Sequence, residues 1–175
     1  MTTNPQVSVI IPSKNRLDLL QQCVESIKQR CMWTGPDRSS DPTRQAFFYE
    51  IVVVDTGDGK AADWVEDTRN RPRSTPAVLR RAVRLPGGAF AQACNMGVKM
   101  ADGAQILLCN DDIIVQNDII RAFRLASPEH APGCIIGARL LYPNGLIQHA
   151  GIGFDSDGGP YNLWNLAPGE HPEAM

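Results

Sequence analysis

Residues 7–16 read VSVIIPSKNR, a short run rich in β-branched residues that is closed by a proline and followed by polar residues. A strand buried on both faces of a sheet has this composition, because β-branched side chains pack well on a pleated surface. Asn15 is of a type that commonly caps a helix. After it, apolar residues recur at helical spacing, at Leu20, Val24, Ile27 and Cys31. The sequence therefore predicts a first strand followed directly by a helix.

Strand and helix patterns alternate along the rest of the chain. Further strands are predicted over residues 49–54, 77–85, 106–109 and 134–142. Helices are predicted near residues 61–67, 91–101 and 117–126. The dipeptide Asn144-Gly145, between two apolar runs, predicts a hairpin of the last strand with residues 146–149. This order indicates an α/β fold with a mainly parallel open sheet, helices on both faces and a C-terminal antiparallel hairpin.

Three details of this assignment can be compared with a structure. The basic residues of the third strand, Arg80, Arg81 and Arg84, indicate a strand at a sheet edge. The helix that follows Gly88 is expected to be capped by Gly103. Its core-facing stripe is expected to be Ala91, Cys94, Val98 and Ala101. Residues 35–45 and 70–76 are expected to form surface loops.

With 175 residues, the chain has the size of about one domain. Its 17 basic and 19 acidic residues give a net charge of -2, so nucleic acid is not an expected partner. No apolar run approaches the ~20 residues of a membrane-spanning helix, and the N-terminus lacks a signal-peptide pattern. We expect a cytoplasmic protein, either free or, in its full length, peripheral to the inner membrane. The five cysteines contain no CxxC pair and are expected to be mostly buried free thiols.

Polar residues follow three of the predicted strands. They are residues 12–16, 55–58 and 110–112. The carboxyl ends of parallel strands lie at one edge of a sheet, where the N-termini of helices also converge and ligands bind. We therefore expect these three segments to meet in one polar crevice.

Asn110-Asp111-Asp112 is the most informative of the three segments. In an extended chain Asn110 and Asp112 project to the same side and Asp111 to the other. Oxygen donors of this kind suit Mg²⁺ or Mn²⁺, which complete their coordination with phosphate oxygens and water. Carboxylates can face a diphosphate only with a cation between them. The alternative interpretation is a helix cap after a strand, and both stay open at this point.

Two other residues have a functional and a structural interpretation. Asp55 can accept hydrogen bonds from a base or a ribose, or it can cap the turn made by Gly57 and Gly59. His149 can bind the same cation or a phosphate, or it can be structural. Residues 57–62 match G-x-G-x-x-A, but no acidic residue follows at the distance that an NAD site needs.

Four segments taken together resemble family 2 glycosyltransferases of the GT-A fold, in the same order and spacing. They are residues 7–16, 51–58, 88–97 and 107–112. Residues 138–151 further resemble the rhamnosyltransferase-like branch of this family. The resemblance implies an inverting transfer of a sugar from a nucleoside diphosphate donor to a hydroxyl of a carbohydrate or other acceptor.

The resemblance also implies roles for individual residues. It implies a Mn²⁺ or Mg²⁺ ion held at a DxD-like motif, with Asp112 as the direct ligand. The residues that it implies for binding the nucleotide sugar are Pro12, Ser13, Arg16, Asp55, Asn110 and Asp111. Two further candidates come from their positions in the chain, His149 as a metal ligand and Asn95, a polar residue in the helix after Gly88, as part of the nucleotide-sugar site. The first DxD position is Asn110 here, so one contact that is usually made by a carboxylate is neutral.

The resemblance covers only part of what family members contain. They usually continue into an acceptor-binding segment with the catalytic base, which we expect to be absent from this chain. Residues 1–154 are expected to form the nucleotide-sugar-binding domain, and residues 155–175 an irregular tail that starts the acceptor-binding segment. Residues 35–45 form an insertion before the second strand.

Two other functions are alternatives. The chain can be a non-catalytic module that binds nucleotide sugars or another protein. It can also be a sugar nucleotidyltransferase, which would need a glycine-rich, basic phosphate loop after the first strand. Residues 12–15, Pro-Ser-Lys-Asn, do not form such a loop.

Overall fold

The computed structural model describes residues 5–31, 49–67, 78–126 and 133–171, and both expected loops lie outside these ranges. By internal contacts the chain divides into two compact units, Met1–Leu125 and Ala126–Met175. The boundary expected after residue 154 separates nucleotide-sugar binding from acceptor binding. It stays a prediction. None of the helices in the described part of the chain has the length and hydropathy that a membrane crossing needs.

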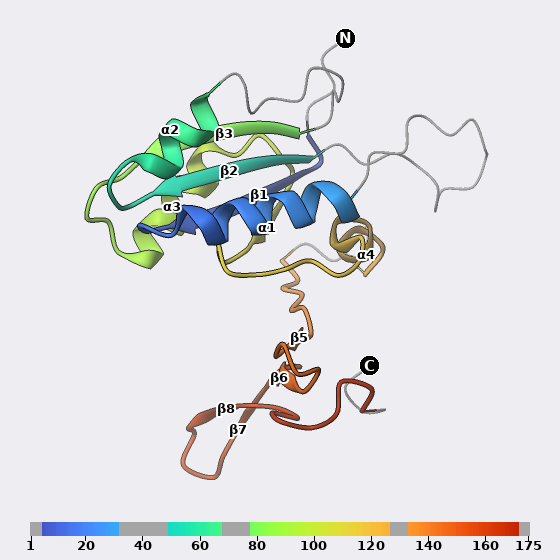
Figure 1. The fold of residues 1–175 in the computed structure, drawn as a ribbon. Coiled ribbons are helices and arrows are strands. Elements are labelled where there is room, and N and C mark those ends of the chain that lie inside the picture. The colour runs from blue at the N-terminus through green and yellow to red at the C-terminus, as the bar shows by residue number, and fades with distance from the viewer. Residues whose placement is uncertain (1–4, 32–48, 68–77, 127–132, 172–175) are drawn as a thin grey trace, which may run out of the picture. The chain divides into compact units, whose positions relative to one another are not determined.

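The first unit contains a parallel sheet in the strand order β3-β2-β1-β4, with helices in the connections (Figure 1). The strands are β1 (Val7–Ser13), β2 (Tyr49–Asp55), β3 (Val78–Arg84) and β4 (Gln105–Leu108). The helices are α1 (Leu17–Arg30), α2 (Lys60–Glu66), α3 (Phe90–Met100) and α4 (Ile119–Ala126). The predicted α/β class and the position of β3 at a sheet edge are confirmed.

Helices cover both faces of this sheet, as the buried composition of β1 and β2 predicts. Residues at odd positions of the two strands pack with α1, α2 and α4. Residues at even positions pack with α3 on the other face. The two sets are Val9, Ile11, Ile51 and Val53, and Ile10, Val52 and Val54. Both central strands are buried along their whole length.

Helix α1 buries the face that the sequence predicts but begins one residue later than expected. Its buried residues include Leu20, Val24 and Ile27. The N-terminal cap is Arg16, which makes no side-chain capping bond, and the predicted cap Asn15 is wrong. Asn15 instead adopts a left-handed conformation with φ of 57°, which asparagine tolerates better than most residues.

Helix α3 approaches the sheet through small residues, and the predicted apolar stripe is wrong in part. The buried residues are Ala93, Cys94 and Gly97, whereas Ala91 and Val98 are exposed. A Cβ atom at Gly97 would lie 2.2 Å from Cγ2 of Ile10, so only glycine permits this approach. The helix ends at Met100 with Ala101 as its C-cap, so the predicted cap Gly103 is wrong. A search for apolar spacing misses such a face because glycine carries no hydrophobic side chain.

At the amino edge of the sheet, a buried carboxylate ties the strands together. Glu50 on β2 accepts hydrogen bonds from Oγ of Ser8 and from the backbone N–H of Asp102, both at 2.7 Å. Nε of Arg81 lies 3.4 Å from Oε2 of Glu50. Arg81 also forms an ion pair with Asp102. This network lies at the opposite end of the strands from the polar segments that follow them.

The second unit contains two antiparallel hairpins. The predicted hairpin is confirmed as β5 (Leu140–Leu141) and β6 (Ile147–His149). The predicted strand over residues 134–142 is much shorter than expected. Ile135 is 99% exposed, so its side chain is not buried by the other described residues. A second hairpin, β7 (Ile152–Phe154) with β8 (Pro160–Asn162), was not predicted.

Replacement of Gly97 by valine is expected to destabilise the first unit by about 1–3 kcal/mol, the usual cost of overpacking a core. The new side chain would overlap Ile10 or force α3 away from the sheet. Ala91→Val on the exposed side of the same helix is the matched control. Urea unfolding of both variants measures the difference. Equal stability of the two variants would show that the helix does not need a glycine at this contact.

Candidate functional site

The site lies where the strand order of the sheet reverses. The chain passes from β1 to β2 and β3 on one side and then returns to place β4 on the other side of β1. At such a switch point the loops after the two adjacent strands diverge and leave room for a ligand at their carboxyl ends. The loops that diverge here are the one after Ser13, at the end of β1, and the one after Leu108, at the end of β4.

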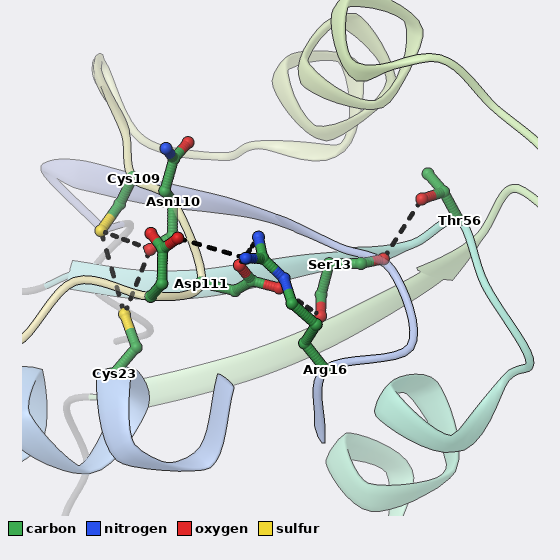
Figure 2. A network of polar contacts seen from close by, with 8 residues as sticks. Ser13, Arg16, Cys23, Thr56, Cys109, Asn110 and Asp111 are labelled. Atoms are coloured by element: carbon green, nitrogen blue, oxygen red, sulfur yellow. Dashed lines mark hydrogen bonds and ion pairs between the residues drawn. The ribbon is translucent and has the colours of Figure 1, made fainter. Parts of the chain in front are cut away.

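Asp111 is the centre of the contacts between these two loops. Its side chain is completely buried. Oγ of Ser13 donates to Oδ2 of Asp111 at 2.8 Å, and the guanidinium of Arg16 pairs with Oδ1. Figure 2 shows Arg16 and Ser13 on the β1 side of this carboxylate. Because a buried carboxylate is stable only when it is paired and hydrogen-bonded, these contacts fix the loop after β4 against the end of β1.

Arg16 also pairs with Asp112, with a distance of 3.2 Å between Nη1 and Oδ2. The side chains of Arg16 and Asp112 are 48% and 43% exposed, so both can reorient toward a ligand. Asn110 is exposed as well. The predicted alternation, with Asn110 and Asp112 outward and Asp111 inward, agrees with this burial pattern. The segment is a turn after the strand, however, and not a continuation of it.

The end of β2 joins the same edge of the sheet. The backbone N–H of Thr56 donates to the carbonyl of Ser13 at 2.9 Å, and its hydroxyl donates to the same carbonyl at 3.3 Å. Oδ1 of Asn15 accepts from the N–H of Asp58 at 2.8 Å. A Cβ atom at Gly57 would lie 2.0 Å from that same Oδ1. The expected meeting of the three polar segments is thus confirmed.

Asp55 uses both carboxylate oxygens within the protein. Oδ1 accepts from the N–H of Gly57 at 2.9 Å and Oδ2 from the N–H of Ala62 at 3.0 Å. The side chain is 2% exposed. These bonds satisfy donors of the turn after β2 and of the start of α2, which is the structural role that the sequence left open. A carboxylate can accept further bonds, so a contact with a ligand stays a prediction.

A cavity of about 360 Å³ opens between the start of α1 and the loop after β2. Arg16 contributes to it together with Asp58 and Lys60. The ion pair with Lys60, at 2.7 Å, holds the pKa of Asp58 below its ordinary value, so that carboxylate stays charged at neutral pH. The other lining residues are Asn15, Leu17, Asp18, Gln21 and Ala61.

The remaining predicted residues are placed differently. Pro12 is buried in β1 next to the site. Asn95 is exposed on α3, outside the contacts around Asp111. His149 belongs to the second unit, where its Nδ1 lies 2.9 Å from Oδ1 of Asn162. The roles of these three residues stay predictions.

Thr56 was missed as a site residue, and the role of Asn15 was mistaken, because the bonds that involve them join different loops. No local spacing in the sequence indicates such a bond. A non-glycine residue in the left-handed conformation, as at Asn15, becomes visible only with coordinates.

The residues at this edge suit a hard divalent cation. Within the described residues, no group of three or more His, Cys, Asp and Glu side chains could hold a metal on its own. Mg²⁺ and Mn²⁺ are commonly bound by one or two carboxylates together with the phosphate oxygens of a substrate. A single half-exposed carboxylate, Asp112, next to a buried and fully bonded one, Asp111, fits that mode and not a closed protein cage.

The chain matches a known protein family. The model of the family described as "Glycosyl transferase family 2" matches residues 8–148. Among curated proteins, the uncharacterized protein y4gI of Sinorhizobium fredii is 32% identical over 177 residues, which cover 98% of this chain and 17% of that protein. The O-antigen biosynthesis protein RfbC of Myxococcus xanthus is 25% identical over 177 residues, which cover 94% and 12%. The chain thus spans less than a fifth of either relative.

Two solved structures are similar to this chain at a TM-score of 0.47. One is residues 1–349 of S. aureus TarS, which is 20% identical and covers 69% of this chain and 31% of that chain. The other is the mannosyltransferase PcManGT from Pyrobaculum calidifontis in complex with GDP-Man and Mn²⁺. It is 22% identical and covers 73% and 34%.

The bond between Ser13 and Asp111 is expected to couple the two loops energetically. In a double-mutant cycle of Ser13→Ala and Asp111→Ala, we expect a coupling of about 1.5–3 kcal/mol, the usual value for a hydrogen bond to a charged group. A control cycle of Ser13→Ala with Asp58→Ala should be additive within about 0.5 kcal/mol, because these side chains do not share a bond. Urea unfolding measures both cycles. Additivity in the first cycle would contradict the assigned bond.

Proposed function

The chain belongs to glycosyl transferase family 2, and from this membership we propose that it binds the nucleoside diphosphate sugar of an inverting glycosyltransferase. The proposed donor site is the carboxyl edge of β1, β2 and β4. Residues 1–154 supply this site in the proposal, and residues 155–175 begin the segment that binds the acceptor. Because the curated relatives are several times longer, the transfer reaction is proposed for the whole protein of which this sequence is a part.

One observation supports the proposal most, namely the pairing of Arg16 with both Asp111 and Asp112 at the switch point of the sheet. A buried acid, an exposed acid and a half-exposed guanidinium within one contact cluster can bind a cation and a diphosphate together. Asp111 acts as a positioning residue, because both of its oxygens are already bonded to Ser13 and Arg16. Asp112 is therefore the acid that is available to contact the ligand.

Asp112 is the proposed ligand of Mn²⁺ or Mg²⁺, and the diphosphate and water supply the other oxygens. When it is bound, the ion supplies Lewis-acid stabilisation of the negative charge on the departing diphosphate. Arg16 can then turn from Asp112 toward a phosphate, since its side chain is half exposed and guanidinium groups bind phosphates with two parallel bonds. Ser13 keeps Asp111 in place during this exchange.

The nucleoside part of the donor is proposed to lie beside the ends of β1 and β2. Pro12 forms part of the wall, and Asp55 lies beneath the base. Asn110 contacts the ribose or the phosphates, and Asn95 supports the same pocket from α3. The cavity at Arg16 and Lys60 provides space next to this edge, and its lining contains two basic and two acidic side chains.

The acceptor hydroxyl is proposed to belong to a carbohydrate. The relative RfbC carries the description O-antigen biosynthesis, which supports polysaccharide assembly as the setting. The carboxylate that deprotonates this hydroxyl for in-line attack is proposed to lie in the acceptor-binding part of the whole protein.

We expect the 175-residue chain to bind nucleoside diphosphates in a Mn²⁺-dependent manner, and Asp112→Ala to weaken this binding by about 10-fold or more. Calorimetric titration with UDP, GDP and dTDP, each with and without Mn²⁺, measures the affinity. The readout is binding, so it does not require an acceptor or a complete enzyme.

Asp102→Ala is the matched control for this experiment. Asp102 is exposed to nearly the same extent as Asp112, 45% against 43%, and it also pairs with an arginine. It lies at the amino edge of the sheet, so its loss should leave nucleotide affinity unchanged. Binding that does not depend on Mn²⁺, or equal losses in the two variants, would overturn the proposed donor site and favour a non-catalytic interaction module.

A further inference from the structure

Two cysteines from distant parts of the chain meet directly behind the carboxylates. Sγ of Cys23, on α1, lies 3.9 Å from Sγ of Cys109, the first residue after β4. Both sulfur atoms converge on the carbonyl oxygen of Asn110, at 3.5 Å and 3.4 Å (Figure 2). Cys109 immediately precedes the Asn110-Asp111-Asp112 segment. A change at this pair therefore acts on the backbone that carries the two acids.

The two thiols differ in pKa and in exposure. The contact with the Cys23 thiol lowers the pKa of Cys109, an effect that outweighs the opposing effects of burial and of Asp111 and Asp112. The same contact and burial raise the pKa of Cys23. Cys109 is also the more accessible of the two, because Cys23 is fully buried. Since the thiolate is the reactive form, an oxidant meets Cys109 first.

We propose that Cys23 and Cys109 form a peroxide-sensitive dithiol that closes to an intramolecular disulfide. Hydrogen peroxide first oxidises the Cys109 thiol to a sulfenic acid and is itself reduced to water. The sulfur of Cys23 then attacks the sulfur of Cys109, the S–O bond breaks, and a second water leaves with the proton of the Cys23 thiol. Both sulfurs end in the disulfide, and peroxide is the only oxidant that is needed.

Closure of this bond changes the segment after β4. The sulfur atoms must approach from 3.9 Å to about 2.05 Å. The backbone N–H of Cys109 is bonded to the carbonyl of Ile10 at 3.0 Å, and Cys23 lies in the middle of α1. The carbonyl of Asn110, which both sulfur atoms contact, must then adjust, and with it the turn that carries Asp111 and Asp112. On the proposed function, oxidation therefore weakens cation binding at Asp112.

The test of the disulfide uses the full chain with Cys134→Ser, which removes an exposed thiol that could link two molecules. After treatment with hydrogen peroxide, peptide mapping without reductant should recover a cross-link between the peptides of Cys23 and Cys109. Cys31 should stay reduced, because burial raises its pKa to about 11. Peroxide treatment that leaves the pair reduced, or that takes Cys109 to the sulfinic acid without a cross-link, would overturn the proposal.

Two single variants separate the steps of the reaction. In Cys23→Ser, a dimedone adduct should form at Cys109, because the sulfenic acid no longer finds its partner thiol. In Cys109→Ser, Cys23 should resist peroxide as Cys31 does. Circular dichroism confirms that each variant is folded. Rapid oxidation of Cys23 in the absence of Cys109 would contradict the assigned order.

The consequence for the site is measured as the affinity for Mn²⁺ with UDP, GDP or dTDP. The oxidised form should bind about 10-fold more weakly than the reduced form, and dithiothreitol should restore the affinity. Peroxide should have no such effect on Cys23→Ser. Equal affinities of the reduced and cross-linked forms would overturn the coupling. Failure of the reduced form to bind would refute the proposed function. The peptide map would still show whether the disulfide between Cys23 and Cys109 forms.

Discussion

The architecture of the site depends on one buried charge. Asp111 has no exposed surface, and an unpaired carboxylate in that position would cost several kcal/mol. Its bonds to Ser13 and Arg16 remove this cost, but only while the loop after β4 lies against the end of β1. The carboxylate thus specifies the arrangement of the two loops more than it adds to the stability of the fold.

The constraint extends to the neighbouring residues on both sides. Because Asp111 is held inward, Asn110 and Asp112 are turned outward, toward the edge where a ligand of a parallel sheet binds. Because Arg16 is held by the acids, α1 starts at Leu17 and Asn15 is free to bond the loop after β2. A few polar bonds therefore align three strand ends.

The sequence predicted the layers of the fold well and the contacts of the site in part. Buried β-branched strands and a regular helix stripe such as that of α1 leave a periodic pattern, so β1, β2 and α1 were predicted within a few residues. The face of α3 was missed because close packing at Gly97 depends on the absence of a side chain. The hairpin of β7 and β8 was missed because its strands are three residues each, too short for a period.

The polar contacts were less predictable than the fold, for a physical reason. The edge of the sheet at which Ser13, Arg16 and Asp111 lie follows from strand direction, which the sequence does indicate. Which donor meets which acceptor depends on the register of β1 and β4 and on the shape of the turns.

The parallel sheet also affects when the site can form during folding. Ser13 and Asp111 are 98 positions apart in the chain. Since the entropy of closing so long a loop must be overcome before this contact stabilises the chain, we expect the site to form late in folding.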